Sequence, residues 1–201
     1  MQRVVFLPIA NPRLRSAPPA GPDWLHEVKH DGWRAQLQRA SSDAIILSKN
    51  GKDISGRFNI IRDALRSLPD CIIDAEIVGC DADGIPDFRG LMAGNSAGLC
   101  AWCFDLLAID GKDVRKEPLE QRRERLLDLL SGAGQDLLRF SESFGDADKL
   151  LAATARIGLE GIVSKKRSAP YVAGPNCGWV KVKTQPWRQA NRERYKMFEG
   201  N

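Results

Sequence analysis

The sequence has no long apolar stretch, since nothing in its 201 residues approaches a run of eighteen apolar side chains. A helix that crosses a bilayer needs about twenty such residues, so we expect no membrane span and no membrane partner. The N-terminal segment 1–8 is too short in its apolar part to be a secretory signal. These two absences make the cytoplasm the expected location.

Cysteine is scarce as well, with five residues at no framework spacing. An odd, irregular set favours free thiols in a reducing compartment. Cys100 and Cys103 form a C-x-x-C pattern, but it opens an apolar segment typical of a strand, where positions three apart point to opposite faces. No second Cys or His pair follows, so the pattern does not favour a zinc or redox site.

The remaining composition is that of an ordinary globular protein, with 43% hydrophobic and 28% charged residues. The length allows one domain or two small ones, and we find no internal repeat. The net charge of +4 and the pI of about 8.9 slightly favour an acidic partner such as a nucleic acid or a nucleotide.

Apolar patterning predicts a mixed fold. Strand-like runs cover residues 44–47, 71–78, 101–109, 161–164 and 179–182, and helix-like patterns cover 58–68, 118–130, 147–157 and 186–197. The strands do not alternate strictly with helices, which favours an α+β fold with antiparallel sheets over a doubly wound sheet. In the second helix, Leu119, Leu126, Leu127 and Leu130 are expected to share one face.

The two ends of the chain differ from its middle. Residues 1–23 carry several prolines and are expected to be an extended lead-in. From Thr184 onward the chain is polar and basic. We therefore expect one domain over residues 1–183, followed by a basic helical tail over 184–201.

The most informative stretch is Glu27–Arg34, which contains Lys29. A lone lysine among charged residues is normally solvated, but here an apolar approach precedes it and an Asp-Gly turn follows it. That geometry would hold the amine at the end of a strand, facing a cleft. A nucleophilic lysine must lose its proton, which requires desolvation or nearby cations; Lys181 and Lys183 are the candidate cations.

The pattern E-x-K-x-D-G-x-R over residues 27–34 resembles the hallmark of covalent nucleotidyltransferases: DNA ligases, RNA ligases and capping enzymes. Further segments follow in the family's order, at residues 48–51, 74–78, 104–107, 122–123, 160–165 and 179–183. Together they resemble the adenylation domain of ATP-dependent DNA ligases, most closely bacterial ligase D-type domains and their small stand-alone relatives. Lys49 stands where the family usually has Arg, and Ala75 where it usually has Gly.

The resemblance implies a role for each of these positions. Lys29 would be the nucleophile that becomes linked to AMP. Glu27 would read the adenine amino group, and Phe104 would stack on adenine in place of its default role in core packing. Arg34 would contact the ribose and the DNA 5′-phosphate, and Lys49 would touch the nicked strand. Lys165, Lys181 and Lys183 would bind phosphate, while Glu76 and Glu160 would serve a divalent metal, with Glu76 also near the ribose.

The implied function is a nick-sealing DNA ligase in DNA repair, using ATP and Mg²⁺ or Mn²⁺ through a lysyl-AMP intermediate. Its partner would be nicked double-stranded DNA, and the protein would be a monomer in the bacterial cytoplasm, associated with the nucleoid. The family's OB-fold domain is not expected within this sequence, so a separate OB-fold or end-binding repair protein is a candidate partner.

Two other functions stay open on the sequence. One is an RNA ligase or a capping-type nucleotidyltransferase; the F-D-L-L and R-R segments argue against capping. The other is a non-catalytic module that binds nicks or ends and descends from a ligase. The intact set of Lys29, Glu76, Glu160, Lys181 and Lys183 argues against the second.

Overall fold

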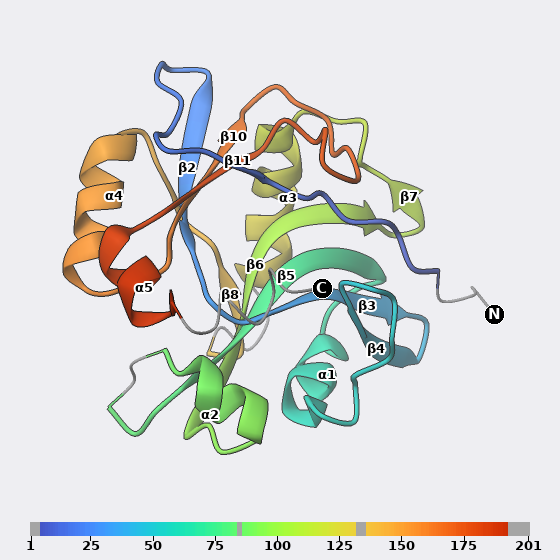
Figure 1. Ribbon diagram of the computed structural model, residues 1–201. Coiled ribbons are helices and arrows are strands. Elements are labelled where there is room, and N and C mark those ends of the chain that lie inside the picture. The colour runs from blue at the N-terminus through green and yellow to red at the C-terminus, as the bar shows by residue number, and fades with distance from the viewer. Residues whose placement is uncertain (1–4, 84–85, 132–135, 193–201) are drawn as a thin grey trace.

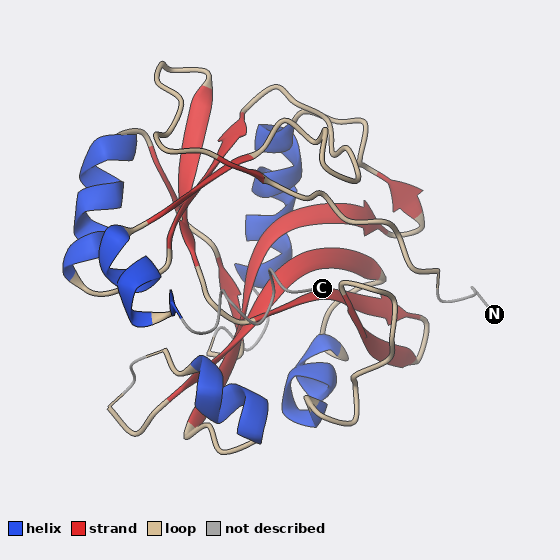
Figure 2. Ribbon diagram, in the orientation of Figure 1, coloured by secondary structure: helices blue, strands red, loops and turns tan. Residues whose placement is uncertain are grey.

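The computed structural model describes residues 5–83, 86–131 and 136–192. Two sheets pack with five helices among the described residues, which confirms the α+β prediction (Figures 1 and 2). The helices are α1 (Asn59–Leu65), α2 (Phe88–Ala93), α3 (Leu119–Ser131), α4 (Ala147–Arg156) and α5 (Gln185–Ala190). None of the helices in these ranges is long and apolar enough to cross a membrane.

The first sheet has the order β1 (Arg13–Leu14), β11 (Val180–Lys183), β10 (Gly161–Lys166), β2 (Trp24–Lys29) and β9 (Ser143–Phe144). The second has the order β4 (Asp43–Ser48), β3 (Trp33–Ala40), β5 (Cys71–Cys80), β6 (Gly98–Ile109) and β7 (Lys112–Asp113), with β8 (Leu138–Phe140) also paired to β6. Pairing is antiparallel except for β1 with β11 and β8 with β6. The described part of the lead-in thus adds an edge strand to the first sheet.

In β11 of the first sheet, valines alternate with lysines, so one face of this strand is apolar and the other is polar. Ile162 and Val182 lie buried with Leu150 of α4, so α4 covers the apolar face. Successive side chains of a strand point to opposite faces, which places Glu27 and Lys29 on the face away from α4.

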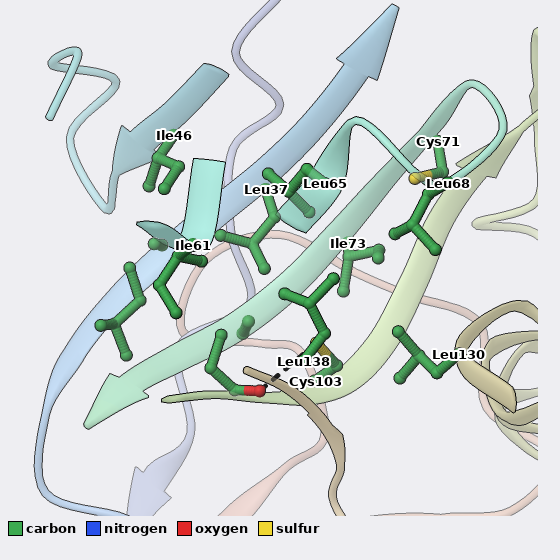
Figure 3. Close-up of a cluster of buried hydrophobic side chains, with 14 of the residues drawn as sticks. Leu37, Ile46, Ile61, Leu65, Leu68, Cys71, Ile73, Cys103, Leu130 and Leu138 are labelled. Atoms are coloured by element: carbon green, nitrogen blue, oxygen red, sulfur yellow. Dashed lines mark hydrogen bonds between the residues drawn. The ribbon is translucent and has the colours of Figure 1, made fainter. Parts of the chain in front are cut away.

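The main core lies on one face of the second sheet (Figure 3). Leu37 and Ile73 come from adjacent strands, and Ile61 of α1 and Leu130 of α3 pack against this layer; all are buried. Because strand residues alternate between faces, this core orients the polar residues of β5 to the opposite face. That face opens toward the first sheet.

Several predicted elements are present with shifted ends. The prediction that Leu127 shares the buried face of its helix is wrong: Leu127 is 50% exposed, while Leu119, Leu126 and Leu130 are buried. The face that packs on β6 instead includes Arg122 and Arg123, which are also buried.

Other elements were not predicted from the apolar patterning. The patterning did not single out β2, β3 or α2, although Lys29 was expected to lie at the end of a strand, as it does in β2. The predicted C-terminal helix is found over Gln185–Ala190, and residues 193–201 of the expected tail lie outside the described residues.

Two glycines permit close approaches that hold the sheets in place. A Cβ at Gly32 would lie 2.2 Å from the carbonyl oxygen of Ile77, and a Cβ at Gly161 would lie 1.9 Å from that of Val182. Gly161 also has a φ of 151°, a region that side chains disfavour. Neither position can therefore accept a larger residue without moving a neighbouring strand.

We expect Gly161→Ala to lower the free energy of unfolding by more than about 1 kcal/mol, because the added methyl meets backbone atoms and φ is unfavourable. Urea unfolding followed by circular dichroism measures this. Gly56→Ala is the matched control, since a Cβ there meets nothing within 4 Å. Equal effects of the two substitutions would contradict the close approach.

Candidate active site

A cavity of about 540 Å³ lies between the two sheets and receives residues from both. From the first sheet it is lined by Glu27, Lys29, Val163, Lys165 and Lys181, and from the second by Trp33, Arg34, Glu76 and Phe104. Ser48, Lys49 and Asn50, at the end of β4, complete one edge.

Strand register explains which side chains of the first sheet meet. Gly161 of the central strand pairs with both Lys29 and Lys183. Two residues further along, Val163 pairs with both Glu27 and Lys181. Directly paired residues share a face, so the polar face carries two rows about 7 Å apart, as the strand rise of about 3.3 Å per residue requires.

Glu160 immediately precedes this central strand and joins two of the predicted lysines. Its Oε2 accepts from Lys29 Nζ at 2.7 Å and its Oε1 from Lys183 Nζ at 2.8 Å. The carboxylate is 4% exposed, against 21% for the Lys29 side chain. Glu160 lines a neighbouring pocket of about 300 Å³ together with His30 and Asp31. It therefore lies behind Lys29, next to the main cavity.

The charge state of Lys29 differs from the sequence expectation. Burial lowers the pKa of Lys29, but the charges of Glu160, Glu76 and Asp31 outweigh it, and the net pKa is raised. The expectation that Lys181 and Lys183 depress this pKa is wrong for this arrangement. Lys183 is paired with Glu160, so the nearest charges to the Lys29 amine are carboxylates.

The pKa of Lys181, unlike that of Lys29, is lowered. Burial is the largest cause, followed by the charges of Lys29 and Lys183. Its side chain lines the cavity, so it brings a cation to the row next to Lys29. An anionic ligand in the cavity would relieve the repulsion among these lysines.

Glu76 faces Lys29 from the second sheet. Its Oε1 accepts from the backbone N–H of Gly32 at 3.1 Å. Burial raises the pKa of Glu76 to about 7, with Glu160 and Asp31 adding to the rise and Lys29 and Arg34 opposing it. The carboxylates therefore repel one another across the site.

That repulsion fits a divalent cation, because oxygen donors suit Mg²⁺ and the ion would relieve it. Within the described ranges, no group of three or more His, Cys, Asp or Glu side chains is poised to hold a metal. Glu76 and Glu160 could supply only part of a coordination shell, which suits an ion that keeps waters and binds phosphate oxygens.

Arg34 lines the cavity, but its guanidinium is paired with the buried carboxylate of Asp74. Its Nε and Nη2 donate to the two oxygens of Asp74, each at 2.7 Å. Tyr171 donates its hydroxyl to Asp74 Oδ2 at 2.6 Å and accepts from the N–H of Ala10 at 2.9 Å. Tyr171 thus has a structural role here and ties the lead-in to the site.

Glu27 and Lys165 form the opposite end of the cavity. Lys165 Nζ lies 2.8 Å from Glu27 Oε1 and 3.3 Å from the carbonyl oxygen of Phe104. Lys165 is 1% exposed, and burial lowers its pKa. In this structure the ammonium is paired with Glu27, two rows away from Lys29, and its contact with phosphate stays a prediction.

Phe104 lies between the core and the cavity, at 9% exposure. The Arg34 guanidinium is 4.7 Å and Lys165 Nζ is 4.5 Å from its ring centroid, and Trp179 packs edge-on at 6.2 Å. The ring is therefore held by cations, and its stacking on a base stays a prediction.

His30 closes the cavity beside Lys29. Its ring stacks on Trp102 with centroids 4.4 Å apart, and burial together with the Lys29 charge lowers its pKa to about 4. His30 is consequently neutral near pH 7 and adds no charge to the wall of the cavity.

Sequence reasoning missed Asp74 and Arg123 as functional neighbours, although both lie within segments that carried the family resemblance. Arg123 Nη1 donates to Glu27 Oε1 at 2.8 Å. The sequence signal for Arg123 was the pair of adjacent arginines in an amphipathic helix. Adjacent positions on a helix point in different directions, and arginine is normally exposed, so a buried arginine in such a helix needs an acidic partner. Arg122 is instead fully buried on Asp105, with bonds of 2.7 and 2.8 Å.

The fold is that of a nucleotidyltransferase domain of a DNA ligase. The ligase domain of LigD from M. tuberculosis superposes with a TM-score of 0.74 and 26% identity, covering 87% of this chain and 60% of that one. This chain belongs to the ATP dependent DNA ligase domain family, which it matches over residues 18–183.

Two bacterial relatives set the scale of the similarity. The multifunctional non-homologous end joining protein LigD of Pseudomonas aeruginosa is 35% identical over 179 residues, which are 86% of this chain and 21% of that protein. A probable DNA ligase of Mycobacterium sp. (strain KMS) is 33% identical over 170 residues, 79% of this chain and 33% of that protein. The chain thus spans a fifth to a third of their length.

The raised pKa of Glu76 gives a test by pH. The folded value of about 7 lies above the ordinary 4.5, so the folded state binds this proton more tightly and stability falls as pH rises between the two values. We expect Glu76→Gln, which cannot ionise, to exceed the wild type in unfolding free energy by about 1–3 kcal/mol at pH 8, and to match it near pH 4.5. Urea unfolding at several pH values measures this; a difference independent of pH would refute the shifted pKa.

Proposed function

We propose that this chain is the adenylating catalytic domain of an ATP-dependent DNA ligase, with Lys29 as the nucleophile. The observation that carries the proposal is the convergence of Lys29, Lys181 and Glu76 from two sheets on one cavity. Membership of the ligase domain family supplies the chemistry to which that convergence corresponds.

The cavity suits a nucleoside triphosphate in size and in polarity. Glu27 and Phe104 are the candidates for the base, and Lys29 and Lys181 are the candidates for phosphate. Lys181 lies in the same row as Glu27 but two strands away, on β11. The paired rows of the first sheet place Lys29 one row beyond Glu27, so the amine would meet the phosphate side of a nucleotide whose base is near Glu27.

In the first step, Lys29 Nζ attacks the α-phosphorus of ATP. The Lys29 ammonium first gives one proton to solvent. A P–N bond then forms, and the bond from the α-phosphorus to the oxygen that bridges to the β-phosphate breaks. Pyrophosphate leaves and takes up the second proton that the nitrogen loses. Lys181 stabilises the charge that develops on the phosphoryl oxygens. A divalent cation held by Glu76 and Glu160 would neutralise phosphate charge and the carboxylates that keep Lys29 protonated.

Lys183 and Glu160 hold Lys29 in place before this step. Glu160 is hydrogen-bonded to Lys29 Nζ at 2.7 Å, so attack requires the amine to leave this carboxylate. Lys183, which also lies 4.3 Å from the Trp187 ring centroid, keeps Glu160 in place. The pair thereby restricts the amine to the side of the cavity before attack.

The later steps involve nicked double-stranded DNA. A 5′-phosphate oxygen attacks the lysyl-AMP phosphorus, the P–N bond breaks, and the leaving Lys29 nitrogen takes up protons from solvent. The 3′-hydroxyl then attacks the 5′-phosphorus and gives its proton to solvent, a new phosphodiester bond forms, and AMP leaves. Lys49 is exposed at the edge of the cavity, where it suits the DNA backbone. Arg34 would reach the 5′-phosphate only by giving up part of its contact with Asp74.

The likeness to the P. aeruginosa end-joining protein supports a role in DNA break repair. The corresponding place of action is the bacterial cytoplasm, on the nucleoid. A separate OB-fold or end-binding protein is the partner that would supply further contacts to the DNA.

Intact-protein mass spectrometry after incubation with ATP and Mg²⁺ or Mn²⁺ tests the proposal. We expect the mass of one AMP to be added to the wild type and to Lys149→Ala, whose lysine is 87% exposed on α4, and no addition to Lys29→Ala. Without Lys29 the site retains its cations but has no nucleophile.

The same assay distinguishes the other functions. An adduct from GTP in place of ATP would indicate a capping-type enzyme, and no adduct at all would indicate a binding module. The isolated AMP adduct should then seal a nicked DNA duplex; sealing of RNA alone would make the domain an RNA ligase.

A further inference from the structure

Two buried groups that no part of this mechanism uses, Arg123 and Ser141, converge on Glu27. Glu27 Oε1 accepts from Arg123 Nη1 and from Lys165 Nζ, each at 2.8 Å. Glu27 Oε2 accepts from the Ser141 hydroxyl at 3.0 Å. All four side chains are nearly inaccessible to solvent, with exposures between 1% and 6%.

Arg123 also contacts Ser141, which is itself hydrogen-bonded to Glu27. Its Nη2 donates to the carbonyl oxygen of Ser141 at 2.6 Å, and its guanidinium lies 4.6 Å from the Phe140 ring centroid. The N–H of Ser141 donates to the carbonyl oxygen of Cys103 at 2.8 Å. Arg123, Ser141 and Glu27 thus form a closed triangle, anchored to β6 by the backbone.

The triangle determines which acceptor sites of Glu27 remain. A carboxylate has about four lone-pair sites, two on each oxygen. Two cations fill those of Oε1, and the Ser141 hydroxyl fills one of Oε2. Glu27 lines the cavity, so its remaining acceptor capacity belongs to Oε2.

We propose that Arg123 and Ser141 are positioning residues that hold Glu27 Oε2 as a fixed hydrogen-bond acceptor and so select a 6-amino purine over a 6-oxo purine. This inference rests on the proposed function, because it takes the cavity to hold a nucleotide with its base at Glu27. A 6-amino group donates to a carboxylate. A 6-oxo group offers only an acceptor, and the buried carboxylate repels it.

The rigidity of the triangle matters for this selection. A carboxylate that could rotate would present either oxygen, or a bound water, to the wrong base. Sites built to hydrogen-bond one group reject analogues that lack it by large factors, because buried polar atoms are left unpaired. Loosening the triangle should therefore reduce discrimination more than it reduces binding of the preferred nucleotide.

The test measures the dissociation constants of ATP and GTP by calorimetry, and the rate of adduct formation with each, for the wild type, Ser141→Ala and Arg123→Lys. Ser141→Ala removes only the hydroxyl on Oε2. Arg123→Lys keeps the charge but loses the second arm that anchors the Ser141 carbonyl. We expect the wild type to prefer ATP, and each variant to reduce the GTP:ATP ratio of dissociation constants by about tenfold.

Arg122→Lys is the matched control, because Arg122 is the neighbouring, equally buried arginine of α3 and bonds to Asp105, not to Glu27. We expect it to lower thermal stability and leave the ratio unchanged. Arg125→Met, at an exposed ion pair with Glu117, serves the same purpose with less effect on folding.

The outcomes separate this inference from the proposed function. A ratio unchanged in Ser141→Ala and Arg123→Lys, or a wild type that binds both purines equally, overturns the positioning role. ATP binding with the expected ratios but without a lysine adduct supports the positioning role and contradicts the ligase chemistry.

Discussion

The buried carboxylate of Glu160, shared between Lys29 and Lys183, is the contact on which the geometry of the site depends. Its two oxygens accept at 2.7 and 2.8 Å from strands that flank β10 on either side. A carboxylate that is 4% exposed is tolerated only when it is paired. Both partners are thereby held at the same end of the sheet.

The rest of the site follows from the two-residue alternation of the strands. Pairing of Gly161 and Val163 with β2 and β11 places two rows of polar side chains on one face, and α4 covers the other. The second sheet supplies Glu76 through the same alternation. Gly32 lets the chain cross between the sheets within contact of Ile77. The cavity is thus bounded by two sheets that are each packed on their far side.

Much of this could be predicted from local patterning. The apolar runs of β5, β6 and β10 and the helices α3 and α4 follow their periodicity. Each of the residues assigned to the site by resemblance lies in the cavity wall or, like Glu160 and Lys183, directly behind it. Most of the motif segments carry this information because they lie in paired strands, where register fixes the position of each side chain.

The charge state and the partners could not be predicted in the same way. The pKa of Lys29 depends on which charge is nearest, and Glu160, distant in sequence, lies closer than the expected cations. Leu127 was expected on the packed face of α3, which instead includes Arg122 and Arg123. These two arginines are buried there because they form ion pairs with the buried acids Asp105 and Glu27. Such choices depend on tertiary pairing, which no local pattern encodes.

The central claim is that Glu160 keeps Lys29 protonated in the free domain, and nitrogen-15 NMR of the lysine side chains tests it most directly. The Lys29 signal, assigned with Lys29→Arg, should titrate above the ordinary lysine value of about 10.4, and its pKa should fall in Glu160→Gln. A Lys29 that titrates well below 10.4 in the wild type, or that is indifferent to Glu160→Gln, would contradict the account.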